Sequence, residues 1–517
     1  MAIAVATSLL KCGMPAASGY TMLQTQKPVI LELNTRVWLQ SLNRDDHSPL
    51  TLAQVPDAAL DRIAGVGANF LWLMGVWTRS PKGREQALAL LPKFRGALPD
   101  IVAANVIASP YAVFDWQVAP ELGGREALAD LRRRLRQRGI GLILDYVSNH
   151  VARDHPWLYR QPDWFIQGSE RDLQERPGDF FASQTRAGRR IFAHGRDPWF
   201  PGWTDTAQVN AFNPDYRQAV RQVLFDLAAQ CDGLRCDMAM LLCNEVFATT
   251  WRDHIDPFDS PPEEIWQELI AALREQFPDI LLIAEVYWDM EAELLRLGFD
   301  YCYDKPLYDA LLHCDAGRLR AMLSTLVAHQ DRLLRFTENH DERRAVTAFG
   351  EARSRAAFTL AATLPGAFLL HGGQLEGRAT HLPVQLARRP VEASLPDHED
   401  YQRRVLRELG AAPFRLGQWQ LFEVLPPLDG HDRPDQLFAY GWACPGDWRL
   451  VIVNLGASPA WGRVPLAAWP EIATGSWRLE DCLDDACYDR DGARMTREGL
   501  EVLLPARGAH LFRFRPA

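Results

Sequence analysis

GLILD, at residues 141–145, is an apolar run that ends on a carboxylate, and it decides how the rest of the chain is interpreted. Such a run suits a strand buried on both faces of a parallel sheet, and its polar last residue marks where the chain leaves the core. Three further segments have the same form: GLRCD (233–237), LLIAE (281–285) and LLRFTENHD (333–341). In a closed β/α barrel the carboxyl ends of the strands converge on one mouth, so we expect the four carboxylates to meet there.

Strand-like runs alternate with helical patterns over most of the chain, which predicts parallel strands joined by crossover helices. Eight strands are predicted, at residues 29–33, 69–74, 141–146, 233–237, 280–285, 299–303, 333–337 and 367–371. Helices are predicted between them, among others at 125–138, 216–230, 263–276 and 319–329. The predicted fold class is therefore α/β, with a (β/α)8 TIM barrel.

Two regions lack this alternation of strands and helices. Residues 148–213 are rich in Trp, Pro, Gly and Asp without a clear helical period, and an unstructured loop of that length is unusual in a compact domain, so we predict an inserted subdomain after strand 3. After residue 409 the short β-like runs are typical of an antiparallel β-sandwich. The predicted domains are an N-terminal extension (1–28), the catalytic barrel (29–147 and 214–408), the inserted subdomain B (148–213) and a C-terminal β-sandwich domain (409–517).

The composition narrows the possible partners. The 517 residues are 47% hydrophobic, enough to bury a large core, and carry a formal net charge of −10. Because phosphates require a basic surface, we predict no nucleic-acid partner. The basic cluster at 132–138 alternates with leucines at helical spacing and is interpreted as the solvated face of a barrel helix. No stretch is long and apolar enough to span a bilayer, so no membrane partner is expected.

The nine cysteines include no CxxC pair, which favours reduced thiols over a disulfide framework or a zinc site. We therefore predict a cytoplasmic location. Secretion is the alternative, because residues 1–10 are apolar but lack the positively charged leading region of a signal peptide. Nothing in the sequence indicates an oligomeric state.

Asp237, Glu285 and Asp341 are the candidates for catalysis. Cleaving a glycosidic bond with retention needs one carboxylate as nucleophile and a carboxylic acid that protonates the leaving oxygen. Arg235 lies two residues before Asp237, so on a strand both side chains share a face and the guanidinium keeps this nucleophile ionised. The sequence neighbours of Glu285 are apolar or aromatic, a setting that favours a raised pKa and the role of acid/base.

A structural role as ion-pair partners is the alternative for these carboxylates. Their occurrence at three strand ends, flanked by Arg235, His150 and His340, favours chemistry instead. Both histidines follow an asparagine near a strand end, which favours hydrogen bonds to sugar hydroxyls over a place in the core. Trp288, shortly after Glu285, is predicted to touch substrate on the leaving-group side.

The chain resembles the α-amylase superfamily of retaining glycoside hydrolases and transglycosylases. The resemblance rests on DYVSNH (145–150), GLRCD (233–237), AEV (284–286) and ENHD (338–341), which occur in the family's order, with a fitting insertion after the third strand. It implies that Asp237 is the nucleophile, that Glu285 is the acid/base, and that Asp341 binds sugar hydroxyls and stabilises the oxocarbenium-like transition state.

The resemblance also implies a set of substrate-binding residues around the attacked sugar: Tyr111, which would stack on it, with Asp145, His150, Arg235 and His340. An ordinary packing aromatic is the alternative for Tyr111. No cofactor is required. Asn149 is a candidate calcium ligand, because the Asn of the family's Asn-His pair often binds this ion. No further calcium ligands are identified in the sequence.

The predicted function is that of a retaining α-glycoside hydrolase acting on α-linked glucosides of the malto-oligosaccharide type, so the expected partner is an oligo- or polysaccharide. Met240-Leu241 stand where many α-amylases carry Lys-His, and Ala112 stands where several exo-acting members carry Asp, so neither endo nor exo action is predicted. The alternative is an α-glucosyl- or glucanotransferase, or a trehalose- or sucrose-type isomerising enzyme, on the same fold. A non-catalytic glycan-binding scaffold is a remote alternative.

Overall fold

The structure is a computed structural model that describes residues 27–43, 50–255, 260–325, 327–428 and 434–517. The predictions for the first residues of the chain, including the possible signal segment at 1–10, fall outside this part.

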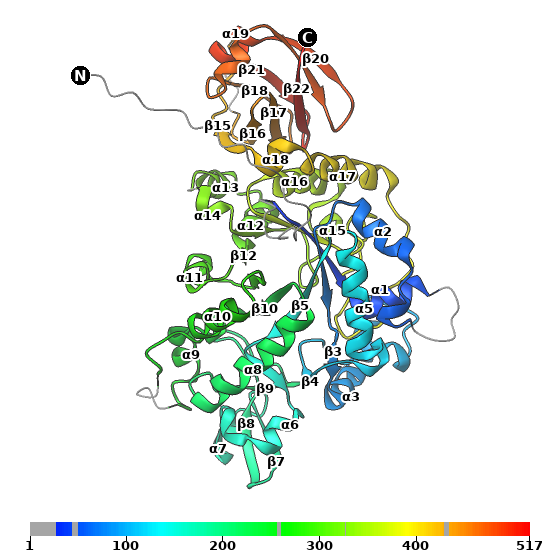
Figure 1. Cartoon of the computed structure of the whole chain (residues 1–517), viewed down its shortest axis with the longest axis vertical. Coiled ribbons are helices and arrows are strands. Elements are labelled where there is room, and N and C mark those ends of the chain that lie inside the picture. Colours follow the sequence, from blue (N-terminus) through cyan, green and yellow to red (C-terminus); the bar gives the residue numbers. More distant parts are fainter. Residues whose placement is uncertain (1–26, 44–49, 256–259, 326, 429–433) are drawn as a thin grey trace, which may run out of the picture.

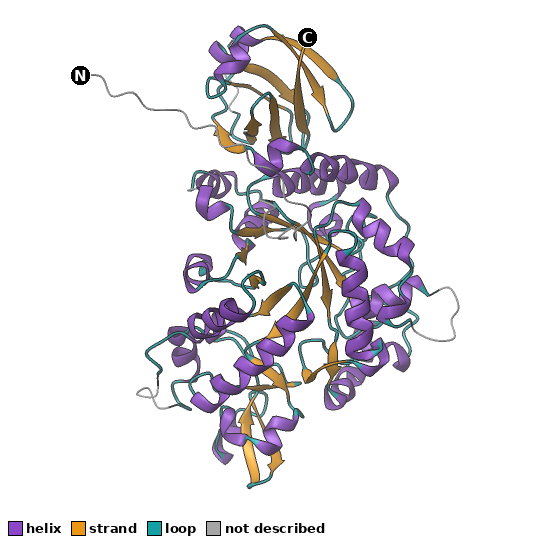
Figure 2. Ribbon diagram, in the orientation of Figure 1, coloured by secondary structure: helices purple, strands orange, loops and turns teal. Residues whose placement is uncertain are grey.

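Within the described part of the chain, eight parallel strands close into a barrel (Figures 1 and 2). In their order around the barrel they are β1 (Val29–Asn34), β2 (Phe70–Met74), β5 (Gly141–Val147), β10 (Gly233–Asp237), β11 (Leu281–Ala284), β12 (Tyr301–Tyr303), β13 (Leu333–Arg335) and β14 (Ala367–His371). All seven residues of β5 are buried, as expected for a strand covered on both faces. The predicted (β/α)8 barrel is confirmed.

Helices surround the barrel (Figure 2). Those along the barrel strands are α1 (Thr35–Leu42), α2 (Asp57–Gly65), α5 (Gly124–Arg136), α8 (Pro214–Gln230), α9 (Asn244–Trp251), α10 (Ile265–Gln276), α11 (Glu291–Leu297), α12 (Lys305–His313), α13 (Ala316–Leu323), α14 (Val327–Gln330), α15 (Ala345–Phe349), α16 (Glu351–Thr363) and α17 (Pro396–Leu409). The single helix predicted at 319–329 is wrong, because α13 ends at Leu323 and α14 begins at Val327.

The basic cluster on α5 also differs from its prediction. The leucines at helical spacing face the core as expected, and Arg133 and Arg136 are more than half exposed, but the other three arginines of the cluster are less than one fifth exposed. Arg132 and Arg136 both bind Asp232, which precedes β10, while Arg134 and Arg138 bind Asp57 on α2. The cluster therefore connects α5 to its neighbours.

The long connections between strands carry the small elements near the barrel mouth. Between β2 and β5 lie β3 (Trp77–Arg79), α3 (Pro81–Ala89), α4 (Leu91–Phe94) and β4 (Val113–Val118). After β5 come β6 (His150–Ala152), α6 (Pro156–Arg160), α7 (Glu170–Glu175), β7 (Phe180–Thr185), β8 (Gly188–Ala193) and β9 (Thr206–Gln208). β6 pairs with β9 and β7 with β8. The domain limits drawn from the sequence stay predictions.

The C-terminal part is a β-sheet domain, which Figure 1 shows at the opposite end of the molecule from β7 and β8. After α18 (Ala412–Leu416), a six-stranded antiparallel sheet has the order β15 (Gln418–Phe422), β16 (Leu437–Cys444), β17 (Asp447–Asn454), β22 (Ala509–Pro516), β19 (Ser476–Asp481) and β20 (Cys487–Asp491). β18 (Ala460–Val464) pairs with β21 (Leu500–Leu504), and α19 (Gly492–Arg497) lies between β20 and β21. Trp448, Trp469 and Trp477 contribute to a core of this domain's own.

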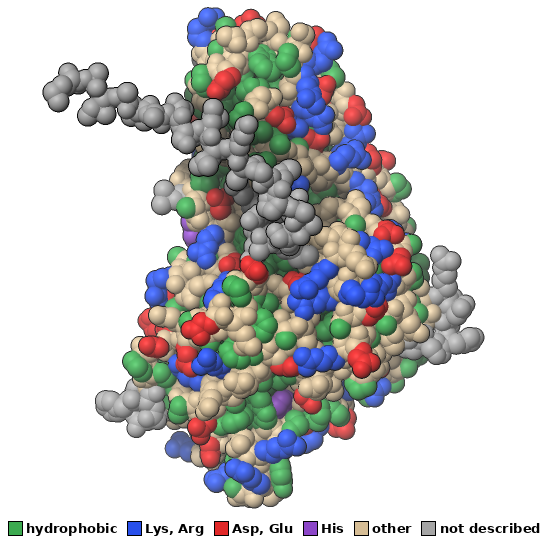
Figure 3. All heavy atoms as spheres, in the orientation of Figure 1, with side chains coloured by type: hydrophobic (Ala, Val, Ile, Leu, Met, Phe, Trp, Pro, Cys, Tyr) green, Lys and Arg blue, Asp and Glu red, His purple; other side chains and the backbone are tan. Residues whose placement is uncertain are grey.

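Acidic and basic side chains are interspersed over the face seen in Figure 3. Among the described residues, none of the helices combines the length and the apolar character needed to cross a membrane. The eight cysteines in this part of the chain are all free thiols.

Candidate active site

The predicted catalytic carboxylates come from the carboxyl-terminal ends of barrel strands. Asp237 is the last residue of β10, and Glu285 directly follows β11. Asp145 lies inside β5, two residues before its end, rather than at the end as predicted. Asp341 follows β13. Because β5, β10 and β11 are adjacent, three of these carboxylates come from one sector of the barrel.

Arg235 is the residue that joins them. Its Nη1 lies 2.6 Å from Oδ1 of Asp237 and 3.4 Å from Oδ1 of Asp145, and its Nη2 lies 2.8 Å from Oε2 of Glu285. The Arg235 side chain is 1% exposed. Its guanidinium lies over three aromatic rings, those of Trp72, Tyr111 and Tyr303. The predicted contact between Arg235 and Asp237 is confirmed, and a shared contact with Glu285 is added to it.

The surroundings of Glu285 are more polar than the sequence indicated. Besides Arg235, the backbone N–H of Met238 donates to Oε2 at 2.7 Å and the hydroxyl of Tyr287 donates to Oε1 at 2.9 Å. Burial nevertheless raises the pKa of Glu285 to about 7; Arg235 opposes this shift and the negative charge of Asp237 adds to it. A carboxyl group with such a pKa can donate a proton near neutral pH.

Burial also raises the pKa of the other two carboxylates that touch Arg235. For Asp237 the charge and the hydrogen bond of Arg235 oppose this rise. For Asp145 burial raises the pKa to about 6, again against the charge of Arg235. One guanidinium therefore contacts three buried acids. The lowering effect of Arg235 on the pKa of Asp237, which the sequence predicts, is present, but burial outweighs it.

His340 is the second organising residue. Its Nε2 lies 2.6 Å from the hydroxyl of Tyr111 and 3.1 Å from Oδ2 of Asp341, and its Nδ1 lies 2.6 Å from Oε1 of Glu32. Burial disfavours the charged ring, but Asp341 and Glu32 together raise the pKa of His340 well above its usual value. The imidazole is thus held as a cation between two carboxylates.

Asp341 differs from the other carboxylates because its side chain is 47% exposed at the mouth. Burial would raise the pKa of Asp341, but the charge and hydrogen bond of His340, together with the charge of Arg235, lower it to about 2. Asp341 is ionised at every pH at which the protein would function. Tyr111, predicted to stack on a sugar, has its ring stacked on His340, with centroids 5.3 Å apart and planes at 22°.

Glu32 was missed by the sequence analysis. It lies on β1, is fully buried, and contacts the ring of His340. Burial would raise its pKa, but the charges of His340 and His371 lower it. The signal was available, since Glu32 interrupts the apolar run VILEL in the same way that the other carboxylates end theirs.

His150 lies close to this group but does not share its charges. Its pKa falls to about 4 because of burial, an effect that a hydrogen bond to the backbone of Tyr111 partly opposes. The ring is therefore neutral, and it packs against Trp203 with centroids 5.1 Å apart. Trp288 is 40% exposed and adopts a positive φ of 65°, so it stays at the surface after β11. Its contact with substrate remains a prediction.

Asn149 is engaged by another side chain. Its Nδ2 donates to Oε1 of Gln208 at 3.0 Å, and Nε2 of Gln208 donates back to its Oδ1 at 2.9 Å. In the described ranges, groups of three or more His, Cys, Asp or Glu side chains arranged to hold a metal are absent. Calcium binding by Asn149 stays a prediction.

Comparisons with known proteins agree on the family. Two relatives are α-amylase 3 of Dictyoglomus thermophilum, 25% identical over 54% of this chain and 56% of its own length, and α-amylase MalA of Haloarcula japonica, 25% identical over 71% and 51%. A third, α-1,4-glucan:maltose-1-phosphate maltosyltransferase 2 of Streptomyces coelicolor, is 23% identical over 52% and 34%. The chain thus spans about half the length, or less, of these curated relatives.

Solved structures share the fold at low identity. A noncanonic maltogenic α-amylase, AmyB of Thermotoga neapolitana, superposes with a TM-score of 0.67 at 15% identity, covering 96% of this chain and 100% of that one. The α-amylase of Geobacillus thermoleovorans in complex with acarbose gives a TM-score of 0.65 at 18% identity, covering 95% and 98%. The sequence model of the α-amylase catalytic domain matches residues 58–402. Because that match covers well over half of the chain, the protein belongs to the α-amylase family.

Proposed function

We propose that the protein is a retaining α-glycosidase or transglycosylase that acts on α-linked glucosides of the malto-oligosaccharide type. The observation that carries this proposal is the contact of Asp237 and Glu285 with the two sides of one guanidinium, Arg235. A retaining pair needs carboxyl groups about 5–5.5 Å apart, and a shared guanidinium is compatible with that separation. The pKa of Glu285, raised to about 7, supports its role as proton donor.

In this mechanism the carboxylate of Asp237 attacks the anomeric carbon while the carboxyl group of Glu285 protonates the departing glycosidic oxygen. The product of this step is a glycosyl ester on Asp237, and Glu285 is left as a carboxylate. Glu285 then removes a proton from water or from a sugar hydroxyl, which attacks the same carbon and releases Asp237. Arg235 stabilises the negative charge that each carboxylate carries in turn.

Asp341 and His340 would act on the sugar hydroxyls. Asp341 is exposed and ionised, so it can accept hydrogen bonds and stabilise the positive charge that develops on the sugar ring. His340 fixes the position of Asp341 and of Tyr111 through its Nε2. These roles rest on geometry and on the family to which the chain belongs.

Transfer is the second candidate, because several relatives are named as maltosyltransferases, while another is a probable oligo-1,6-glucosidase of Bacillus subtilis. Hydrolysis and transfer share the glycosyl-enzyme and differ only in the acceptor. The test is a chromatographic time course with maltoheptaose, trehalose and sucrose in separate reactions. Shorter maltosaccharides alone would support a hydrolase, and longer or rearranged sugars would support a transferase.

The assignment of Asp237 is tested by Asp237→Asn, which removes the nucleophile while keeping the size of the side chain. Turnover should fall by about 10⁴-fold, whereas binding of substrate persists. Asp130→Asn on the exposed face of α5 is the control and should leave turnover unchanged. Unchanged turnover in Asp237→Asn would contradict the mechanism, and sugar binding by the wild type without any turnover would favour a binding scaffold.

A further inference from the structure

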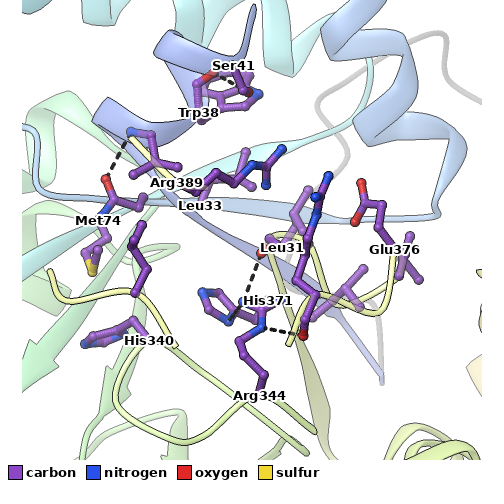
Figure 4. Close-up of a pocket in the computed structure, with 18 of the residues that line it drawn as sticks. Leu31, Leu33, Trp38, Ser41, Met74, His340, Arg344, His371, Glu376 and Arg389 are labelled. Carbon is purple, nitrogen blue, oxygen red and sulfur yellow. Dashed lines mark hydrogen bonds between the residues drawn. The ribbon is translucent and has the colours of Figure 1, made fainter. Parts of the chain in front are cut away.

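A cavity of about 380 Å³ lies beside the candidate active site, where β1, β14 and the segment 372–392 that follows β14 meet the helices α1, α2 and α17 (Figure 4). His340 lines the cavity on the side that faces the candidate active site. Leu33, Trp38 and Met74 contribute apolar surface, and Figure 4 shows Trp38 across the cavity from Arg344 and His371. The cavity is therefore large enough for a sugar unit and is continuous with the residue that positions Asp341.

Arginines dominate the charge of this cavity. Five of them line it, with only two glutamates: Arg62, Arg344, Arg378, Arg389 and Arg403, with Glu376 and Glu392. This local excess of positive charge contrasts with the net charge of −10 of the whole chain. An excess of cations around a cavity in an acidic protein needs an explanation.

Ion pairs account for only some of these arginines. Arg344 binds Glu338 at 2.9 Å, and Arg403 binds Glu399 at 2.7 Å. Arg378 donates from Nη1 to the backbone oxygen of Glu392 at 2.6 Å, but its buried Nε has no partner. Arg389 makes neither a hydrogen bond nor an ion pair with any residue that the structure describes. At least two guanidinium groups thus retain free donors.

Glu376 and Glu392 do not form ion pairs with these arginines. The Oε1 atom of Glu392 accepts hydrogen bonds from the backbone N–H groups of Ala379 and Thr380, at 2.9 and 3.0 Å. Burial lowers the pKa of Arg389, and the positive charges of Arg378 and Arg344 lower it further, against smaller opposing effects of the glutamates. The cations therefore repel one another across the cavity, a cost that a bound anion would remove.

The place of the cavity in the barrel indicates which part of a substrate would reach it. The proposed acid/base, Glu285, follows β11, whereas the cavity is built on β1 and β14. In the barrel order β11 is four strands from β1 in either direction, directly across the mouth. Since Glu285 protonates the leaving group, the opposite wall faces the part of the substrate that is transferred to Asp237, the glycone.

We propose that this cavity is a subsite for an anionic group, a phosphate or a carboxylate, on the glycone part of an α-glucoside. Arg389 and Arg378 bind the anion, for which the planar guanidinium provides paired donors. Trp38 and its apolar neighbours pack against the attached sugar ring. This inference rests on the proposed function, because the term glycone presupposes cleavage between Asp237 and Glu285.

The test measures binding of four probes to the full-length protein by titration calorimetry: glucose, glucose 6-phosphate, glucuronate and inorganic phosphate. At least one of the two anionic sugars should bind about tenfold or more tightly than glucose, as expected for a hydrogen bond between charged groups. Which of the two binds more tightly identifies phosphate or carboxylate as the preferred group.

Arg389→Gln should abolish this advantage of the anionic sugars and leave glucose binding unchanged. Arg378→Gln should act in the same direction. The control is Arg388→Gln. Arg388 directly precedes Arg389 in the sequence, but it binds Asp100 at 3.0 Å and does not line the cavity. Anionic sugars that bind no more tightly than glucose, or equal effects of Arg389→Gln and Arg388→Gln, would overturn the proposal.

Inorganic phosphate that binds in an Arg389-dependent manner as tightly as glucose 6-phosphate would also overturn it, since the cavity would then take a free anion. Hydrolysis of 4-nitrophenyl α-glucoside, measured alongside, tests the proposed function separately because this substrate carries no anionic group. Asp237-dependent hydrolysis without preferential binding of anionic sugars would mean that the further inference alone is wrong.

Discussion

At the scale of single residues, the protonation of Glu285 governs the expected pH dependence. Its pKa is raised to about 7, so the protonated, proton-donating form is present below that pH and is lost as the pH rises through it. We expect kcat/KM to fall about tenfold per pH unit on the alkaline side, with an apparent pKa near 7 that belongs to the coupled pair with Asp237. Steady-state kinetics between about pH 4 and pH 9 measures this fall in kcat/KM.

Tyr287→Phe provides the control for that interpretation. The Tyr287 hydroxyl donates to Oε1 of Glu285 at 2.9 Å and so favours the carboxylate form. Its removal should shift the alkaline limb of the profile to higher pH while activity at low pH is retained. An alkaline limb that moves to lower pH in Tyr287→Phe would contradict the assignment of Glu285. So would a limb that neither Tyr287→Phe nor Glu285→Gln changes.

Glu32 is expected to act through His340, since Nδ1 of His340 lies 2.6 Å from its Oε1. Glu32→Gln removes a buried charge that keeps the imidazole protonated, so kcat/KM should fall about ten- to a hundredfold, the value of a hydrogen bond between charged groups. In a double-mutant cycle, Glu32→Gln should add little to His340→Gln. Additive losses would show that Glu32 acts independently of His340.

The positions of the candidate catalytic carboxylates in the barrel could be predicted because each ends or follows an apolar run, a pattern that is local in sequence. The environment of Glu285 could not, because Arg235 reaches it from the neighbouring strand, and such contacts depend on the register of β10 with β11. Glu32 belongs to the same category: its partner His340 is 308 positions away. Arg378 and Arg389 of the cavity are likewise distant in sequence from Trp38.

At the scale of elements, the arginines of α5 show how a charged helix face contributes to packing. Asp232 is the acceptor for Arg132 and Arg136 and also for the backbone N–H of Leu142 at the start of β5. These contacts lower the pKa of Asp232 despite its burial. One carboxylate thus joins α5, β5 and the segment before β10, an arrangement that helical periodicity alone does not reveal.

Asp232→Ala should therefore lower the free energy of unfolding by about 2–3 kcal/mol, because it leaves buried donors without a partner. The matched control is Asp130→Ala on α5, whose partner Arg133 is 60% exposed, and it should change stability by less than about 0.5 kcal/mol. Urea denaturation followed by circular dichroism measures both. Equal effects of the two substitutions would contradict a special role of Asp232.

Among the elements, the barrel strands were predicted to within two residues at each end because buried parallel strands are short, continuous apolar runs. The C-terminal strands were recovered only in part. The β-like runs expected there, at 420–425, 436–442, 450–454 and 510–514, overlap β15, β16, β17 and β22, whereas β18, β19, β20 and β21 were missed. The residues of β20, CYDRD, are mostly exposed and charged. β20 is an edge strand of this sheet, and such a strand is defined by its hydrogen-bonded neighbour more than by its own composition.

At the scale of the whole molecule, the C-terminal sheet is joined to the barrel by buried polar contacts. The hydroxyls of Tyr440 on β16 and Thr363 on α16 are 2.7 Å apart, and the indole of Trp442 donates to the backbone oxygen of Thr363 at 2.8 Å. Glu408 on α17 accepts from Arg449 at 2.9 Å and from Arg513 at 2.6 Å. We therefore expect the barrel and the sheet to unfold as one unit.

Glu408→Gln tests this coupling. Glu408 and Arg449 are 6% and 4% exposed, so the substitution leaves the buried guanidinium with Asp447 as its remaining counter-charge and should cost about 1–3 kcal/mol. By calorimetry, the single transition expected for the wild type should shift to lower temperature and split, with the sheet melting first. Glu480→Gln is the control on the same sheet, because Glu480 lies 3.8 Å from Arg513 and is 37% exposed, so that its loss should cost less than about 1 kcal/mol. A Glu408→Gln protein that melts in one unshifted transition would mean that apolar packing, rather than this buried ion pair, holds the sheet on the barrel.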